Sequence, residues 1–316
     1  MQSVSPNRQQ NPFDLHDAGA YQRWREAKLA LHPRHVDELI VEVNDPRHLT
    51  DAERRAILAR CANANMAVYR SGVTEEDRSL PRVLGAQLGL ARLDGNWLAD
   101  DSGISLIAVA SGQGERSAYI PYTDRPIKWH TDGYYHPAVR TIRGMILHCV
   151  RSAQTGGENA LMDPEMAYIA VRDANPDWLA ALMAPDAMTI PERTDESGVA
   201  RAAQAGPVFS VDAHTGLLHM RYTARTRSVQ WREDVSTRAA AAFLTTLLAA
   251  DSPFAFRLTL QPGMGLVCNN VLHDRAGFAD LADEPGQTRL LYRARYLDRV
   301  GEPDFTSKSA LSVFCI

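Results

Sequence analysis

The sequence contains no long run of apolar residues. Nowhere in its 316 residues does a stretch approach the roughly 20 apolar residues that a membrane-spanning helix needs. Residues 1–12 are polar and lack the apolar centre of a signal peptide. We therefore expect no membrane partner, and we predict that residues 1–12 form a flexible tail.

Cysteine and basic charge are also scarce. The four cysteines are scattered without a C-x-x-C pair, which argues against a disulfide framework or a zinc site and favours reduced thiols in a cytoplasmic protein. The formal net charge of -4 leaves no basic excess to neutralise phosphates, so we expect no nucleic-acid partner. The sequence leaves the oligomeric state open and is compatible with a homo-oligomer.

Internal repeats and low-complexity segments are absent as well, and 45% hydrophobic residues is enough for a substantial core. We predict one β-rich domain over residues 13–316. Its N-terminal part, about 13–100, is expected to be mainly helical, and its strands are expected over about 101–316. Helices and a lid are expected as an insertion at 163–250.

Hydrophobic periodicity and capping signals place the individual elements. Thr50 and Glu53 form a capping box that opens a helix, and Asp163 caps a helix whose first residue is Pro164. Residues 191–206 have no period, which predicts a mobile loop that acts as a lid. Further helices are predicted at 17–31, 84–93, 176–182 and 236–250, and strands at 66–70, 104–110, 142–150, 159–162, 208–211, 217–222 and 266–268.

Two side chains that bind metals stand two positions apart in the stretch Trp129-His130-Thr131-Asp132. On a strand, residues at this spacing point to the same face, so His130 and Asp132 would be aimed at one point. His273 follows a short apolar run much later in the chain and supplies a third donor. Two histidines and one carboxylate on one face of an octahedral ion leave the opposite face open, which is typical of non-haem Fe(II) enzymes that activate oxygen.

The motif alone has an ordinary explanation, because His-x-Asp specifies only two positions and the chain has ten histidines. Further support comes from residues 289–296, where the two-residue period of a strand places Arg289, Arg293 and Arg295 on one face. Burying several guanidinium groups without anions costs too much free energy. This face therefore predicts anionic partners, which are either ligands or internal carboxylates.

Four short motifs follow one another along the chain in an order that resembles that of a known family. They are His130-x-Asp132, the stretch Thr155-Gly156-Gly157-Glu158-Asn159, His273-Asp274-Arg275, and Arg289-x-x-x-Arg293. The ordered set resembles the taurine dioxygenase and clavaminate synthase-like group of Fe(II)- and 2-oxoglutarate-dependent dioxygenases. The resemblance spans roughly the C-terminal two thirds of the chain and is far more specific than any one motif.

The resemblance implies an α+β, β-rich fold with a double-stranded β-helix, or cupin-like jelly roll, as its core, and with inserted and N-terminal helices. It implies that His130, Asp132 and His273 hold Fe(II), and that 2-oxoglutarate and O2 are consumed to give succinate, CO2 and a hydroxylated product. Arg289 would bind the far carboxylate of 2-oxoglutarate. Asn159 would help, although the family has a threonine at its position.

For the substrate, the sequence indicates only polarity. In the taurine dioxygenase branch, the second arginine of the Arg-x-x-x-Arg pair binds the acidic group of the substrate, which points to Arg293 here. We therefore expect a small molecule with a carboxylate, sulfonate or phosphate, bound by Arg293 and Arg225. Tyr134 shares the parity of His130 and is expected to line the pocket. The alternative is that Arg293 pairs with an internal Asp or Glu and supports the sheet.

Two other classes of protein remain open. One is a cupin-like protein that binds a metal or a small acid without turnover, and the other is a metal-dependent hydrolase or isomerase with a general base near the metal. Neither of them needs a second carboxylate site. Arg289 is therefore the feature that favours the dioxygenase.

Overall fold

The structure is a computed structural model, which describes residues 11–95, 103–110, 119–195, 198–225, 229–249, 252–280 and 288–301. Most of the predicted tail, residues 1–10, lies outside these ranges, as does Cys315. The chain divides into two compact units. Unit 1 comprises Met1–His32, Pro164–Met220 and Gln230–Ala250, and unit 2 comprises Pro33–Asp163, Arg221–Val229 and Asp251–Ile316. A single domain over 13–316 stays a prediction.

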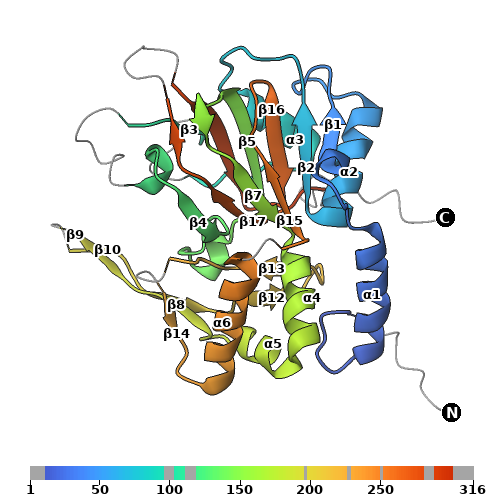
Figure 1. The fold of residues 1–316 in the computed structure, drawn as a ribbon, viewed down its shortest axis with the longest axis vertical. Helices are drawn as coiled ribbons and strands as arrows, with labels where there is room; N and C mark the ends of the chain where they lie inside the picture. Colours follow the sequence, from blue (N-terminus) through green and yellow to red (C-terminus); the bar gives the residue numbers. More distant parts are fainter. Residues whose placement is uncertain are drawn as a thin grey trace. The chain divides into compact units, whose positions relative to one another are not determined.

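Unit 2 contains two main sheets (Figure 1). The six-stranded sheet has the order β1 (Ile40–Glu42), β2 (Met66–Arg70), β16 (Met264–Cys268), β5 (Gly144–Arg151), β19 (Leu290–Tyr296) and β3 (Ser105–Ile107). The four-stranded sheet has the order β15 (Ala255–Leu258), β7 (Asn159–Met162), β17 (Leu272–Arg275) and β4 (Ile127–His130). Apart from the parallel pair β1 and β2, neighbouring strands in both sheets run antiparallel.

The six-stranded sheet is apolar on both faces, because each face packs against another layer. On β2, Ala67 and Tyr69 belong to a core cluster that includes residues of two helices, while Met66 and Val68 belong to a second cluster shared with the four-stranded sheet. Alternating side chains therefore serve different layers. This explains why β2 reads as a continuous apolar run rather than as an alternating one.

Two helices cover the outer face of this sheet. α2 (Asp51–Ala64) begins at the predicted capping box of Thr50 and Glu53, which is confirmed in both directions. α3 (Leu80–Gln87) begins four residues before the predicted range of 84–93 and ends well before its end. That prediction was wrong because Pro81 fits the first turn of a helix, and Gly89, at φ 85°, leaves the helical conformation soon after Gln87.

Unit 1 combines helices with short strands (Figure 1). Its helices are α1 (Ala18–Leu31), α4 (Pro164–Ala174), α5 (Pro176–Leu182) and α6 (Val235–Ala249). A three-stranded sheet joins β11 (Gln204–Gly206), β8 (Met188–Ile190) and β14 (Gln230–Trp231), and β12 (Phe209–Val211) pairs with β13 (Leu218–Met220) as the predicted hairpin. Among the described residues of the chain, no helix is both long and apolar enough to cross a membrane.

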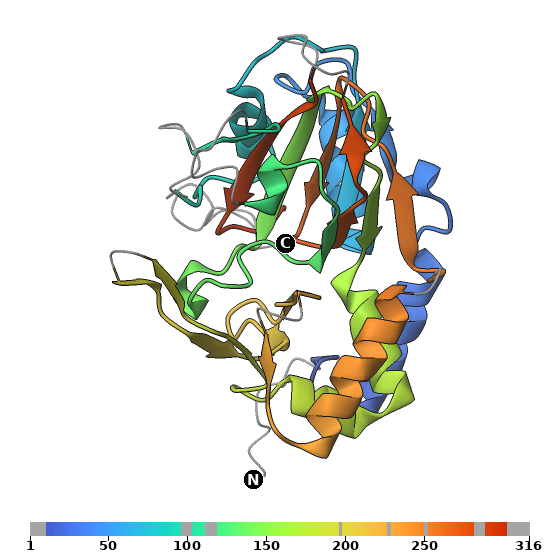
Figure 2. The ribbon, with the colours of Figure 1, turned by 60° about the vertical axis from the view of Figure 1, so that its left-hand side comes forward.

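The segment 191–206 is not the irregular loop that the sequence predicted. β9 (Arg193–Asp195) and β10 (Gly198–Arg201) pair antiparallel, and Figure 2 shows them extending away from the helices of the same unit. Such a two-stranded arm is held by backbone hydrogen bonds and buries neither face, so it needs no apolar period. Its role as a lid stays a prediction.

Candidate active site

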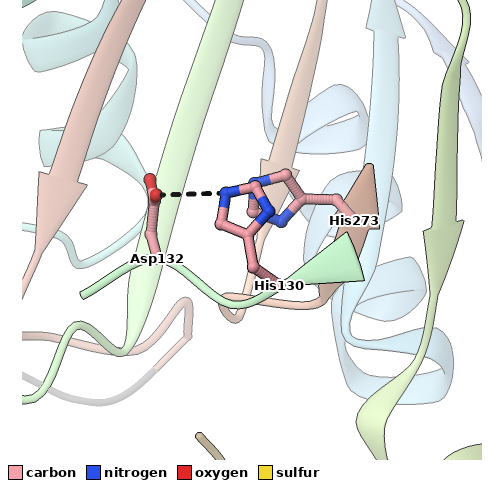
Figure 3. Close-up of side chains that lie close together, drawn as sticks. All are labelled: His130, Asp132 and His273. Atoms are coloured by element: carbon pink, nitrogen blue, oxygen red, sulfur yellow. Dashed lines mark ion pairs between the residues drawn. The ribbon is translucent and has the colours of Figure 1, made fainter. Parts of the chain in front are cut away.

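His130 and His273 lie opposite each other on neighbouring antiparallel strands, β4 and β17. Their ring centroids are 4.2 Å apart. Together with Asp132 they form a group in which one ligand atom of each residue lies within 4.8 Å of the others (Figure 3). The structure thus brings together the three residues that the sequence singled out, although 143 positions separate the two histidines.

Both imidazoles are oriented by the backbone of their own strands. Nδ1 of His130 lies 2.9 Å from the carbonyl of Lys128, and Nδ1 of His273 lies 2.9 Å from the carbonyl of Val271. A carbonyl only accepts a hydrogen bond, so each Nδ1 carries a proton, which leaves Nε2 as the nitrogen that can bind a metal. Burial, with the neighbouring His273, lowers the pKa of His130 to about 3, so this ring is neutral at pH 7.

Asp132 reaches the group in a different way from the one that the sequence suggested. β4 ends at His130, and residues 132–135 form a turn in which Gly133 has a φ of 69°. A positive φ breaks the extended conformation, so the two-residue alternation of a strand does not apply beyond Thr131. The prediction that His130 and Asp132 are aimed at one point is confirmed, although Asp132 lies in a turn and not on the strand. For Tyr134, the condition that the strand continues past Gly133 is not met.

The backbone of this turn is held by the side chain of Asn270, which precedes β17. Its Oδ1 accepts a hydrogen bond from the amide of Asp132 at 2.7 Å, and its Nδ2 donates to the carbonyl of Asp132 at 2.9 Å. Nδ2 also donates to the carbonyl of Ile142 at 2.7 Å. The sequence analysis assigned Asn270 no role. Asn270 has a φ of 52°, a conformation that asparagine tolerates better than most residues.

The carboxylate of Asp132 is buried and charged. Nη1 of Arg293 lies 3.3 Å from its Oδ2, while Oδ2 accepts no hydrogen bond from the described residues. Burial opposes ionisation, but the charges of Arg293 and Arg295 outweigh it and hold the pKa of Asp132 well below its usual range. Two imidazole nitrogens and a carboxylate oxygen with an unsatisfied lone pair form a donor set that fits Fe(II).

A cavity opens beside the two histidines, between the two sheets of unit 2. Leucines from both sheets make much of its wall, among them Leu147, Leu161 and Leu266. Its polar lining consists of His130, Asn159, His273, Asp274, Arg275, Arg289 and Arg293. Ile127 and His130 both reach it, although they are three positions apart, because a register shift interrupts the pairing of β4 with β17.

Arg289 lies in the wall of this cavity and forms no ion pair within the described part of the chain. The residue is 5% exposed, and its guanidinium carbon lies 5.0 Å from the centroid of Phe278. Asp280 accepts a hydrogen bond from the backbone amide of Arg289 at 3.1 Å, and its charge favours the charged guanidinium, but no ion pair joins the two side chains in the described ranges. Burial lowers its pKa from the ordinary value, and the guanidinium still stays charged. This is the environment in which an anionic ligand would be stabilised.

Asn159 faces the same cavity from the start of β7. Its Nδ2 donates to the carbonyl of Asp274 at 2.9 Å, and its Oδ1 is buried and accepts no hydrogen bond within the described chain. Only the second hydrogen of Nδ2 remains available to a carboxylate. The contribution of Asn159 to binding an anion should therefore be smaller than that of Arg289.

Of the remaining predicted residues, Arg293 lines the cavity, whereas Tyr134 and Arg225 do not. The buried ring of Tyr134 packs edge-on against His130, with centroids 6.3 Å apart. Arg225 is exposed, and it follows Thr223, which forms a β-bridge with His130. Arg295, which the sequence placed on the same face as Arg289 and Arg293, has an internal partner, because its Nη2 lies 2.5 Å from Oδ2 of Asp94.

Arg275 and Asp94 are further residues that the sequence analysis did not assign to the site. Arg275 is buried in the cavity wall and donates to the carbonyls of Thr123 at 2.7 Å and Arg125 at 2.5 Å. Asp94 accepts hydrogen bonds from Arg295 and Arg140, both at 2.5 Å. No short motif marks these contacts, since each joins segments far apart in the sequence.

A family model described as taurine catabolism dioxygenase TauD, TfdA family matches residues 37–295. The chain belongs to this family. The match begins after the N-terminal helix α1 and contains all three residues of the metal-binding group. The resemblance inferred from the ordered motifs is therefore confirmed.

One curated relative is a uridine-5'-phosphate dioxygenase from Amycolatopsis sp., 34% identical over 177 residues. That match spans 54% of this chain and 60% of the relative. An asparagine oxygenase solved with Fe(II), 3-hydroxyasparagine and succinate has a TM-score of 0.56 and 17% identity, covering 91% of this chain and 85% of that one. The oxygenase OrfP with Fe and alpha-ketoglutaric acid has a TM-score of 0.56 and 14% identity, covering 81% and 82%. These structures confirm the predicted fold.

Proposed function

We propose that the protein is an Fe(II)- and 2-oxoglutarate-dependent dioxygenase that hydroxylates an unactivated C–H bond of a small anionic substrate. Membership of the TauD/TfdA family supports the class of enzyme. The observation that carries the proposal is one cavity lined by two histidines of the metal-binding group and by a buried arginine, Arg289, that forms no ion pair among the described residues.

In this proposal His130, Asp132 and His273 are the protein ligands of one Fe(II). When bound, the iron supplies the oxidative chemistry that couples conversion of 2-oxoglutarate and O2 into succinate and CO2 to hydroxylation of the substrate. The protein contributes two imidazoles held through Nδ1, with Nε2 left for the metal, and a carboxylate kept ionised by Arg293. The apolar walls of the cavity keep bulk water away.

We assign the far carboxylate of 2-oxoglutarate to Arg289, with Asn159 in a lesser role. The cavity reaches from the two histidines to Arg289, so one ligand lying in it could meet both ends. A planar guanidinium binds a carboxylate through two parallel hydrogen bonds, which a neutral amide does not. The alternative classes, a binding protein without turnover and a hydrolase or isomerase, do not need a second carboxylate site beside the metal.

For the substrate we propose a molecule with a phosphate or another small acidic group, bound by Arg293 and Arg225, with Tyr134 beside it. The name of the curated relative, uridine-5'-phosphate dioxygenase, supports a phosphate. Arg225 has no side-chain partner within the described part of the chain and lies two residues beyond the bridge to His130. Arg293 already contacts Asp132, so it would serve the carboxylate and the substrate together.

The substrate proposal is tested by succinate release from 2-oxoglutarate, with uridine-5'-phosphate and uridine compared at equal concentration. Stimulation by the phosphate ester alone is expected. Arg225→Gln should raise the KM for the phosphate ester, while kcat and the amount of 2-oxoglutarate needed for half-maximal turnover stay unchanged. Arg70→Gln is the matched control, because Arg70 is also exposed in unit 2 but pairs with Glu42. Equal stimulation by uridine would contradict a phosphate site.

Arg293→Leu separates the two roles open to that arginine. Loss of substrate affinity with unchanged uncoupled turnover of 2-oxoglutarate supports binding of the substrate. A global loss of stability would mean that Arg293 serves only Asp132. We further propose a cytoplasmic protein, since the described cysteines, Cys61, Cys149 and Cys268, are buried free thiols.

A further inference from the structure

One amide side chain connects two parts of the metal-binding group. Asn270 lies three positions before His273 at the entrance to β17, and it binds both the amide and the carbonyl of Asp132 at 2.7 and 2.9 Å. The turn that carries Asp132 lies outside the sheet, so it lacks the ladder of hydrogen bonds that fixes the two histidines. Asn270 takes the place of that ladder.

The contacts of Asn270 leave none of its side-chain donors free. Both Nδ2 hydrogens are used, one on Asp132 and one on Ile142, and Oδ1 accepts from Asp132. Ile142 also limits the turn sterically, because a Cβ added at Gly133 would lie 2.5 Å from Cγ1 of Ile142. The turn is therefore fixed through Asn270 and Ile142 together.

The backbone around Asn270 is itself anchored. The neighbouring Asn269 accepts a hydrogen bond at its Oδ1 from the amide of Val300 at 3.0 Å and donates from Nδ2 to Oδ1 of Asn65 at 3.1 Å. Its own amide donates to the carbonyl of Asn65 at 2.8 Å. Asn65 ends α2, so the position of Asn270 is fixed relative to the helical layer.

We infer that Asn270 is a positioning residue that sets where the Asp132 carboxylate lies relative to His130 and His273, and so sets the affinity for the metal. The inference rests on the proposed function. Removal of a side chain that holds a ligand in place typically weakens metal binding by about 10- to 100-fold. Its loss should therefore weaken binding of Fe(II) in excess of any effect on folding.

Asn65 provides a matched control for the experiment. Asn65 and Asn270 have φ values of 58° and 52° and exposures of 3% and 1%, and both make side-chain hydrogen bonds. The side chain of Asn65 bonds to Asp163, Asn269 and Arg299 but not to the turn of Asp132. The backbone hydrogen bond from the amide of Asn269 to the carbonyl of Asn65, which anchors Asn270, is kept in Asn65→Gly. Replacing either by glycine removes the amide side chain without straining the left-handed backbone.

The test is an anaerobic Fe(II) titration of the full chain in competition with a chromogenic chelator, alongside thermal unfolding of the metal-free protein. Asn270→Gly should weaken Fe(II) binding about 10- to 100-fold. The Fe(II) affinity of Asn65→Gly should stay within about twofold of the wild type, even if its Tm falls as much as that of Asn270→Gly. Asn270→Asp keeps an acceptor for the Asp132 amide, so its Fe(II) affinity should lie between those of the wild type and Asn270→Gly. This variant provides the test if Asn270→Gly does not fold.

Wild-type Fe(II) affinity in Asn270→Gly or Asn270→Asp would overturn the inference and leave the proposed function standing. Equal weakening in Asn270→Gly and Asn65→Gly would overturn it too, because the effect would then follow stability alone. A wild-type chain that binds no Fe(II), or that binds it equally well after Asp132→Ala, would overturn the proposed metal site and this inference together.

Discussion

The arginines in strand β19 and just before it differ in what neutralises them. Arg293 and Arg295 are paired inside the protein, with Asp132 at 3.3 Å and with Asp94 at 2.5 Å. Arg289, just before the strand, has no such partner among the described residues, yet it is as buried as Arg295, at 5% and 4% exposure. A buried charge with an internal partner has a structural role, whereas a buried arginine without an ion pair is suited to bind an anionic ligand.

The largest effect on stability is expected at the paired end. Arg295→Met leaves the carboxylate of Asp94 buried with one cation fewer, and breaking such a pair costs about 3 to 5 kcal/mol. Urea denaturation should show this loss in the free energy of unfolding. Arg140→Gln removes the half-exposed partner of the same aspartate and should cost less than about 1 kcal/mol. Similar values for the two variants would remove the distinction between them.

At the unpaired end, the effect should appear in binding and not in folding. Arg289→Met is expected to raise the 2-oxoglutarate concentration needed for half-maximal turnover roughly 10- to 100-fold, the range of a lost charge-assisted hydrogen bond. Its free energy of unfolding should stay within about 1 kcal/mol of the wild type, because no internal pair is broken. A loss of stability like that of Arg295→Met would show that Arg289 has an internal partner after all.

Two histidines, His130 and His148, extend the comparison, because burial keeps them neutral where the arginines stay charged. Burial, aided for His130 by His273, lowers the pKa of His130 to about 3, and burial lowers that of His148 to about 4. Both titrate near 6.5 when unfolded. As the pH falls below about 6.5, the unfolded chain takes up protons that the folded chain refuses, so stability is lost.

The expected loss for the metal-free protein is about 1.4 kcal/mol per pH unit for each histidine, between pH about 6.5 and about 4. Urea denaturation across this interval measures it. His148→Gln should reduce the slope, because His148 contributes its own share. A profile that stays flat down to pH 4 would contradict the burial of neutral imidazoles.

The smallest effect is expected at Asn159, next to Arg289 in the cavity. Asn159→Ala should raise the 2-oxoglutarate requirement only a few-fold, the size of one neutral hydrogen bond. The comparison with Arg289→Met is made in the same turnover assay. The opposite ranking would assign the far carboxylate to the amide and would move the role of Arg289 elsewhere.

The sequence predicted what depends on short-range pattern. The capping box at Thr50 and the helix that follows Asp163 are local signals and are confirmed, and the ordered motifs identified the family. The turn of Asp132 was missed because a strand pattern was extended past His130, where β4 ends, into a turn in which Gly133 has a φ of 69°. Local pattern also misplaced the helix predicted at 84–93 and missed the paired strands within residues 191–206.

The difference between the arginines of β19 was beyond a reading of the sequence. Arg289, Arg293 and Arg295 look equivalent on a strand with a period of two. Their partners decide their roles, and Asp94 lies 201 positions from Arg295. The same holds for Asn270, whose contact with Asp132 spans 138 positions. Long-range pairing of polar groups leaves no periodic signal.

The measurement that tests the account most directly is an anaerobic absorption titration with Fe(II) and 2-oxoglutarate. The wild-type protein is predicted to show a weak visible charge-transfer band that requires both components. His273→Ala should lack the band while keeping its fold, and Arg289→Met should need far more 2-oxoglutarate to develop it. The absence of a band in the wild type at saturating Fe(II) and 2-oxoglutarate, or an unchanged band in His273→Ala, would contradict the account.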